Sequence, residues 1–126
     1  MPTPVYQVKG LDNFIRTLRR AGADMEELKD ANAAAGAVIV SAAKARAPRK
    51  SGALAGSIRS ARQARRVLVM AGGARVPYAG VIHYGWPRHN ISPQPFLTDA
   101  AQETQPTWLP KYNSDLQKIL DKVRGT

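Results

Sequence analysis

The residues of this chain that could do catalytic or metal chemistry are few and scattered. His83 and His89 are the only histidines, and no Asp or Glu lies near them in the sequence. A metal site needs further ligands and an acid–base pair needs a second titratable group, so we interpret both histidines as structural or surface residues. There are no cysteines, which excludes disulfides, thiolate metal sites and a cysteine nucleophile.

The serines and glycines contain no catalytic motif either. None of the serines lies in a nucleophile-elbow sequence, and Gly72-Gly73 matches no phosphate-binding loop, so we interpret this pair as a turn. Ser51 is interpreted as a turn residue and Ser57 as a local cap. The sequence therefore predicts a protein that is not an enzyme and has no metal or cofactor.

Positive charge is the most informative chemical property of the sequence. The formal net charge is +10, and no carboxylate occurs between Asp30 and Asp99. The basic residues of that interval are Lys44, Arg46, Arg49, Lys50, Arg59, Arg62, Arg65, Arg66, Arg75 and Arg88. We expect a positive surface without internal counter-ions, facing nucleic acid or an acidic protein. The other interpretation is a solvated basic face that aids solubility.

The run RQARR, residues 62–66, is the sharpest part of this charge. It precedes a predicted strand, so it would form an exposed limb of a hairpin. RNA-binding modules place aromatic side chains among such charges, yet no Tyr, Trp or Phe occurs between Phe14 and Tyr78. The pattern favours contact with backbone phosphates or an acidic neighbour over sequence readout.

Length and composition predict one small domain. We expect a single domain over residues 1–126, with an ordered core at about 10–122 and an N-terminal arm at 1–9. Much of the 44% apolar content is alanine and aromatics are only 6%, which predicts a thin core that partners complete. The N-terminus has no apolar signal core, so we expect a soluble protein that is intracellular when made.

Periodicity predicts two helices before the sheet. One face of a short helix is formed by Leu11, Phe14, Ile15 and Leu18. A longer helix at about 24–46 would bury Met25, Leu28, Ala35, Ile39 and Ala42. Pro48 ends this helix, and a turn at 49–52 leads through Leu54 and Ile58 into the sheet.

The second half of the chain predicts a hairpin and further helices. The strands are expected at 65–71, with Val67, Val69 and Ala71 on one face, and at 76–84. An irregular loop over 85–95 follows, then a helix to about residue 105 that Pro106 and Pro110 break or kink. A final helix carries Tyr112, Leu116, Ile119, Leu120 and Val123. The expected class is α+β: N-terminal helices, a small antiparallel β-sheet, and C-terminal helices packed on the sheet.

Two segments carry a family resemblance: AKARAPRKSGALAGSIR (43–59), and VPYAGVIHYG followed by SPQPFL (within 76–97). In order and spacing they resemble the neck or tail-completion proteins of long-tailed bacteriophages. That family shows Pro-x-x-(Ser/Thr)-Gly-x-Leu-x-x-Ser-Ile after an Ala-Lys helix end, then a Tyr-Ala-x-x-x-x-(Phe/Tyr)-Gly strand and a Pro-x-Pro-Phe-Leu helix start. The resemblance covers about residues 10–122. The family usually has a glutamate where this chain has His83.

The resemblance implies a structural part of the head-to-tail connector. It implies a homo-oligomeric ring, expected to be a hexamer, around genomic double-stranded DNA that is contacted without sequence preference. Neighbouring rings would be head-completion or adaptor proteins and tail-terminator or tail-tube proteins. The protein would be assembled in the host cytoplasm and end in the neck or tail of the virion, with no membrane partner. A neck ring and a tail-terminating ring both remain open.

Within this hypothesis the sequence assigns three groups of residues. The expected contacts with DNA or an acidic partner are Arg62, Arg65, Arg66, Arg59, Arg49 and Lys50. The expected contacts between subunits or rings are Trp86, Arg88, Tyr84 and His83, because a solvated Trp in a proline loop is unusual. The expected structural residues are Pro48, Gly52, Tyr78, Gly85 and Phe96. We expect Phe96 to lie in the core, and Tyr78 and Tyr84 to lie on one face of the predicted strand.

A free-standing basic nucleic-acid-binding protein is the alternative function. It would be a monomer or dimer that binds duplex DNA alone, with a steep dependence on salt. A small nuclease is a more distant third, because histidines are scarce and carboxylates are missing from the basic interval.

Overall fold

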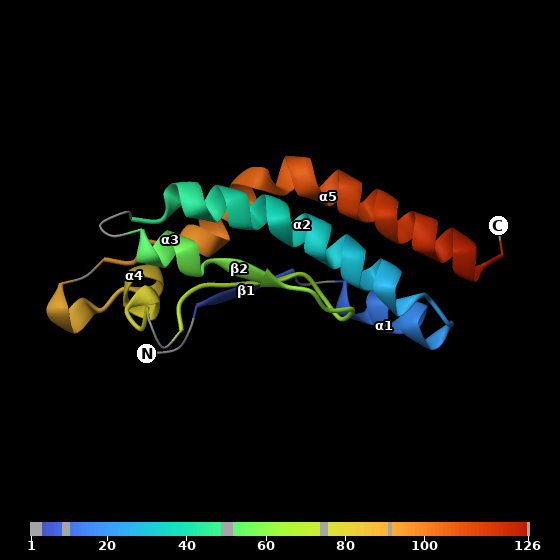
Figure 1. Cartoon of the computed structure of the whole chain (residues 1–126), viewed down its shortest axis with the longest axis horizontal. Coiled ribbons are helices and arrows are strands. Elements are labelled where there is room, and N and C mark those ends of the chain that lie inside the picture. The colour runs from blue at the N-terminus through green and yellow to red at the C-terminus, as the bar shows by residue number, and fades with distance from the viewer. Residues whose placement is uncertain (1–3, 9–10, 49–51, 74–75, 91, 126) are drawn as a thin grey trace.

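The structure is a computed structural model that describes residues 4–8, 11–48, 52–73, 76–90 and 92–125. In chain order the elements are β1 (Val5–Gln7), α1 (Asp12–Arg20), α2 (Met25–Arg46), α3 (Ala53–Ser57), β2 (Arg59–Ala61), β3 (Leu68–Met70), α4 (Ala79–Tyr84), the 3-10 helix η1 (Pro87–His89) and α5 (Phe96–Val123). The expected α+β class is confirmed. The molecule is elongated, with α2 and α5 side by side along its length (Figure 1).

Local sequence signals set the two ends of α2. The Asp24 side chain accepts hydrogen bonds from the backbone amides of Glu26 (2.8 Å) and Glu27 (3.4 Å), which caps the first turn. At the other end Ala47 is extended, with ψ of 140°, because the following Pro48 disfavours helical geometry. The predicted helix over 24–46 is therefore confirmed, with Asp24 as its cap.

The set of α2 residues that is buried differs in part from the predicted set. Leu28, Ala35 and Ile39 are buried as expected, whereas Met25 is 41% exposed. The full buried set is Leu28, Ala31, Asn32, Ala35, Gly36, Ile39 and Ala43. A Cβ on Gly36 would lie 2.8 Å from the Cβ of Ser60, so glycine permits the close approach of α2 to β2.

The sheet has the order β1–β3–β2, and both pairings are antiparallel. Val69 of the central strand lies opposite Tyr6 on one side and Ser60 on the other. Val67, Val69 and Ala71 are fully buried, so the predicted inward face is confirmed although β3 itself is shorter than expected. The prediction of an N-terminal arm over 1–9 is wrong for Val5–Gln7, which form an edge strand of the sheet.

The predicted strand over 76–84 is wrong, because most of it forms the helix α4. Both edges of β3 are already occupied by β1 and β2, so β3 has no edge left for the predicted hairpin partner. Buried Ala79, Gly80 and His83 follow a helical spacing, not the alternation of a strand. Tyr78 and Tyr84 therefore do not share a strand face, and among the described residues of the predicted hairpin only the isolated bridge between Gly73 and Val76 is formed.

α5 is one continuous helix through Pro106 and Pro110, so of the predicted break or kink, the break into two helices is wrong. An interior proline removes a backbone hydrogen bond, but here both halves of the helix are held by burial. Ala100 and Ala101 are buried before the prolines, and Trp108 and Tyr112 after them. Packing against α2 is the most extensive helix contact in the molecule and overrides the local signal.

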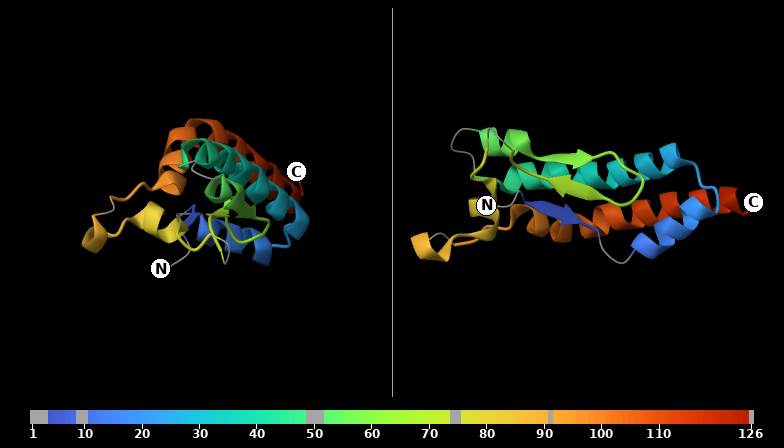
Figure 2. Two further views of the ribbon diagram at one scale, coloured as in Figure 1. Left: turned by 60° about the vertical axis from the view of Figure 1, so that its left-hand side comes forward. Right: turned by 90° about the horizontal axis from the view of Figure 1, so that it is seen from below.

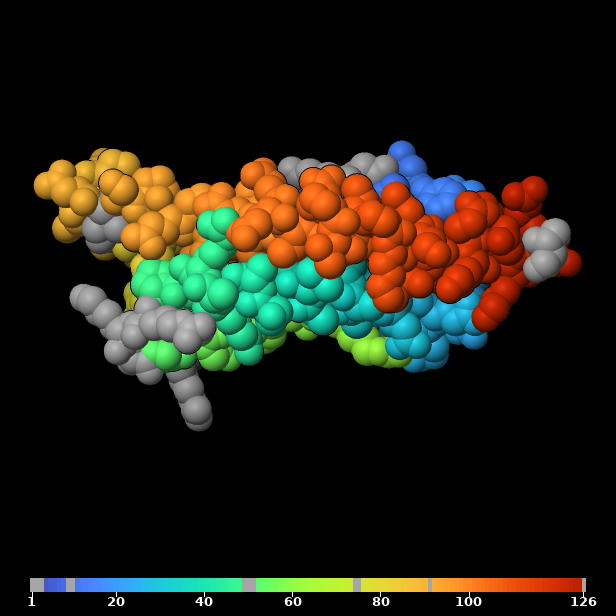
Figure 3. All heavy atoms as spheres, turned by 90° about the horizontal axis from the view of Figure 1, so that it is seen from above, coloured from blue at the N-terminus to red at the C-terminus, as the bar shows by residue number. Residues whose placement is uncertain are grey.

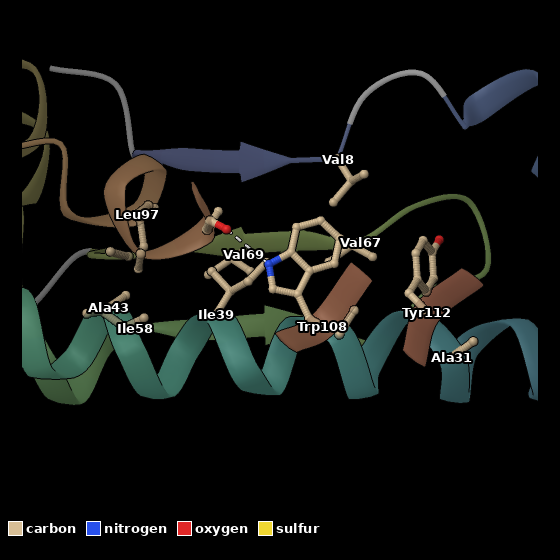
Figure 4. Close-up of a cluster of buried hydrophobic side chains, with 14 of the residues drawn as sticks. Val8, Ala31, Ile39, Ala43, Ile58, Val67, Val69, Leu97, Trp108 and Tyr112 are labelled. Carbon is tan, nitrogen blue, oxygen red and sulfur yellow. Dashed lines mark hydrogen bonds between the residues drawn. The ribbon is translucent and has the colours of Figure 1, made fainter. Parts of the chain in front are cut away.

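The core lies between the helix pair and the sheet (Figure 4). Ile39 of α2, Val69 of β3 and Leu97 of α5 are fully buried there, and Trp108 donates its indole N–H to the carbonyl of Ala101 at 3.0 Å. The core is thus built mainly of aliphatic side chains with a few aromatic anchors.

A buried polar chain joins three elements beside this core. The Tyr112 hydroxyl donates to Asn32 Oδ1 at 2.5 Å, and Asn32 Nδ2 donates to the carbonyl of Gln63 at 2.7 Å. Burial raises the pKa of Tyr112, so its hydroxyl stays protonated and remains a donor. This chain fixes the β2–β3 connection, where Gln63 lies, against α2 and α5.

Candidate functional site: a basic end and an aromatic end

The predicted contact residues divide between opposite ends of the molecule. The β2–β3 connection, residues 62–67, reaches toward α1 at one end, whereas α3, α4 and η1 lie at the other (Figures 1 and 2). We call the first the basic end, defined by α1 and residues 62–66. We call the second the aromatic end, defined by α4, η1 and their flanks at residues 77–90.

Arg62 at the basic end is neutralised by carboxylates of α2. Its Nη2 lies 2.9 Å from Glu26 Oε2 and 2.6 Å from Asp30 Oδ1. These hydrogen bonds raise the pKa of Arg62, and the Arg62 bond lowers the pKa of Glu26. The expectation of a basic surface without internal counter-ions is therefore wrong at this residue, because segments distant in sequence bring acids to it.

Arg65 and Arg66 instead line a hollow with α1. The hollow has a volume of about 260 Å³ and is lined by Asp12, Ile15, Arg16, Arg19, Arg65 and Arg66. Arg66 donates from Nη1 to Gln7 Oε1 at 2.5 Å, and its Nε lies 4.0 Å from Asp12 Oδ1. Four arginines and one aspartate are thus among the residues that line the hollow.

The arginines of α1 were not among the residues predicted to bind DNA or an acidic partner. Arg16, Arg19 and Arg20 are spaced at i, i+3 and i+4, which places them on one helix face, and this spacing was visible in the sequence. They lie outside the carboxylate-free interval, however, and Asp12 is close by. The prediction of basic contacts was limited to the interval without carboxylates, so it did not include these arginines.

Of the other predicted basic contacts, Arg59 lies within the described residues and does not line this hollow. Arg59 Nη1 donates to the carbonyls of Ser57 (2.8 Å) and Gly72 (2.9 Å), so it ties β2 to the chain that leaves β3. Arg46, which is not one of the predicted contacts, pairs with Glu103 of α5. Arg49 and Lys50 lie outside the described residues.

The aromatic end exposes three large side chains. Tyr78 is 40%, Tyr84 45% and Trp86 39% exposed, and Arg88 beside them is exposed as well. The segment projects from the body of the molecule, as the space-filling view shows at its upper left (Figure 3). The Trp86 ring packs against the His89 ring, with ring centroids 4.0 Å apart and an interplanar angle of 58°.

His83 is buried, with 3% of its surface exposed, so the prediction of a surface contact there is wrong for this chain. Its ring makes edge contacts with the rings of Tyr84 and Phe96, with ring centroids 4.6 Å and 5.2 Å apart. Among the described residues neither ring nitrogen has a hydrogen-bond partner. Burial lowers the pKa of His83, although nearby Asp99 opposes this, so the ring is neutral at pH 7.

The predicted structural residues mostly take the expected roles. Gly52 precedes α3 with φ of +77°, and Gly85 ends α4 with φ of +78°; both are conformations that favour glycine. Phe96 is buried at the start of α5, as predicted. Tyr78 differs, because its side chain is exposed and only its carbonyl acts structurally, accepting from the amide of Ile82 at 3.1 Å.

Across the described part of the chain, no group of three or more His, Asp or Glu side chains is placed to hold a metal ion. Among the same residues, no helix has the length and apolarity needed to span a bilayer. Comparison of the chain with protein-family models, curated proteins and solved structures found no match.

Proposed function

We propose that this protein is a structural virion component that forms a ring in the head-to-tail connector of a long-tailed bacteriophage, around the DNA channel. The order and spacing of the motifs at residues 43–59 and 76–97 support the proposal. In the proposed role the protein catalyses no reaction, and its mechanism is geometric: ring contacts, docking of adjacent rings, and non-specific contact with DNA.

The observation that carries the proposal is the exposed aromatic end. Tyr78, Tyr84 and Trp86 come from the same motif segment, and each is about two-fifths exposed. Aromatic side chains are enriched in the buried centres of protein interfaces, and a small domain gains little from exposing three of them. A neighbouring copy or ring that covers this surface explains their exposure.

The polarity of the molecule supports a ring rather than a closed pair. Tyr78, Tyr84 and Trp86 are exposed at the aromatic end and the arginine-lined hollow lies at the basic end, and these two ends lie opposite each other along the elongated molecule (Figure 2). Contacts between unlike surfaces of identical subunits are heterologous, and they generate rings when the rotation closes. A six-fold ring with adaptor and tail proteins above and below it is the specific form that we propose.

The location of the protein in particles tests the proposal. We expect mass spectrometry of purified virions to detect the protein, and labelling for electron microscopy to mark the head–tail junction. Deletion of the gene should yield DNA-filled heads and separate tails. Joined, infectious particles after deletion would contradict the proposed function.

The purified protein should be monomeric or weakly associated, because its exposed contacts would be completed only in the assembly. Analytical ultracentrifugation measures this directly. A tight dimer whose mass does not change on dilution would argue against the ring, since a closed two-fold interface leaves no surface to continue it.

The arginine-lined hollow at the basic end favours the second candidate, a free-standing basic nucleic-acid-binding protein. The two functions differ in where the protein acts. A protein absent from virions that binds duplex DNA with steep salt dependence would support the second candidate.

A further inference from the structure

We infer that the hollow between α1 and the β2–β3 connection is a binding site for a phosphate group of a nucleic-acid backbone. Figure 1 shows the tip of this connection beside α1. The site unites Arg16 and Arg19 of α1 with Arg65 and Arg66, which lie almost fifty residues further along the chain. It is distinct from Arg62, whose charge is already satisfied by Glu26 and Asp30.

The charge of the hollow favours an anion. Its four arginines and single Asp12 give a formal charge of 4 − 1 = +3 among the lining residues. A guanidinium group binds phosphate oxygens through paired N–H donors and keeps its charge at every physiological pH. Without a ligand, these four cations repel one another, and a bound phosphate relieves that repulsion.

Two of the arginines that line the hollow also carry a donor without a partner in the described part of the chain. The Nε atoms of Arg19 and Arg66 are buried and have no hydrogen-bond partner among the described residues. Gln7 accepts from Arg66 Nη1, and Asp12 lies 4.0 Å from Arg66 Nε, so the Arg66 side chain is oriented before any ligand arrives. Such preorganisation lowers the entropic cost of binding.

The size of the hollow selects a small group. Its volume of about 260 Å³ lies below the roughly 300–1,000 Å³ of typical small-molecule sites. Among its lining residues Ile15 is the only apolar one, and none is aromatic. The site therefore suits a phosphate group and offers no platform for stacking a base.

A second hollow beside the first favours a polymeric anion over an isolated carboxylate. It is lined by Arg16, Arg19, Arg20 and Met25, so it shares two arginines with the phosphate site. The two hollows together present five arginines along one face of α1 and the connection. Successive phosphates of one strand match this arrangement better than a single acidic side chain of a partner protein does.

The site itself follows from the geometry of the chain alone. Only the identity of the strand rests on the proposed function, in which the phosphates belong to genomic DNA in the connector channel. Binding is expected without sequence preference, because every contact is to the backbone.

Binding of a short mixed-sequence duplex to the purified full chain, followed by fluorescence anisotropy across a salt series, tests the inference. The double variant Arg16→Gln/Arg19→Gln should weaken binding about tenfold at low salt and lower the salt slope by about 1 to 2. Asp12→Asn removes the only carboxylate of the site and should strengthen binding. The control Arg46→Gln/Lys118→Gln loses the same formal charge outside the hollow and should bind nearly as the parent protein does.

Two further measurements keep the result decisive. Circular dichroism checks the fold, and Arg65→Gln/Arg66→Gln replaces the α1 variant if that variant is unfolded. Titration of the parent protein with inorganic phosphate should shift the NMR signals of α1 and residues 62–66. Equal loss of DNA binding in the site and control variants would overturn the inference, as would binding of polyglutamate in preference to DNA.

The outcomes separate this inference from the proposed function. DNA binding that depends on Arg16 and Arg19, in a protein absent from virions, would retain the site and contradict the connector. A protein present at the head–tail junction whose DNA binding ignores these arginines would retain the connector and contradict the site.

Discussion

The basic end and the aromatic end differ in how their residues come together. At the aromatic end the exposed side chains are neighbours in sequence, within residues 78–88, and a short helix displays them. At the basic end the hollow joins α1 to a loop between two strands, and acids from other elements pair with Arg62 and lie near Arg66. The difference teaches that exposure can be inferred from a local run, whereas net local charge cannot.

The largest expected effect is at the aromatic end. Replacing Tyr84 and Trp86 together by alanine should abolish assembly into particles and leave the fold intact, because both side chains are largely outside the core. Complementation of a phage lacking the gene measures this effect, with circular dichroism as the folding control. Normal numbers of infectious particles from the double variant would show that the aromatic end is not needed for assembly.

A second variant tests how the basic end is held in place. Tyr112→Phe removes the donor to Asn32, which is 1% exposed, and leaves its oxygen unpaired. We expect a loss of about 1–3 kcal/mol in the free energy of unfolding. Denaturant titration gives this value, and Tyr84→Phe serves as the exposed control with no change expected. An unchanged stability for Tyr112→Phe would show that the chain to Gln63 does not support the connection.

A third prediction concerns pH and the buried ring of the aromatic end. The pKa of His83 is lowered by burial from its ordinary value of 6.5, so the unfolded chain binds a proton before the folded chain does. Stability should therefore fall as pH drops through 6.5 toward the lowered pKa of the folded state. In thermal melts across this range, the His83→Phe variant should no longer show this fall in stability with pH, whereas the His89→Gln variant should still show it. Identical pH profiles for the parent protein and His83→Phe would contradict the assignment.

The smallest effect separates the arginines within the basic end. Arg62→Gln should lower the melting temperature slightly and leave DNA binding unchanged, because this charge is paired on an exposed surface. Arg65→Gln removes the same charge from the same connection but should weaken DNA binding. Equal DNA binding by these two variants would show that the division between paired and available arginines has no functional consequence.

Short-range signals account for the features that were predicted correctly. The two ends of α2, the role of Gly52 as a turn residue and the inward face of β3 each depend on residues close together in the chain. The exposure of Trp86 was likewise inferred from its position in a proline loop. Such signals act through backbone sterics and through the periodicity with which side chains point to one face. Both depend little on what the segment packs against.

The sequence by itself therefore determined the α+β class, the helical stripes and the candidate aromatic contacts. Only the tertiary structure decided that Val5–Gln7 close the sheet, that residues 79–84 form a helix and that α5 continues through two prolines. It also decided which arginines are neutralised and which line a hollow. The reason is physical: strand pairing, burial and Coulomb interactions depend on distances in space, and they act between residues that are far apart in the sequence.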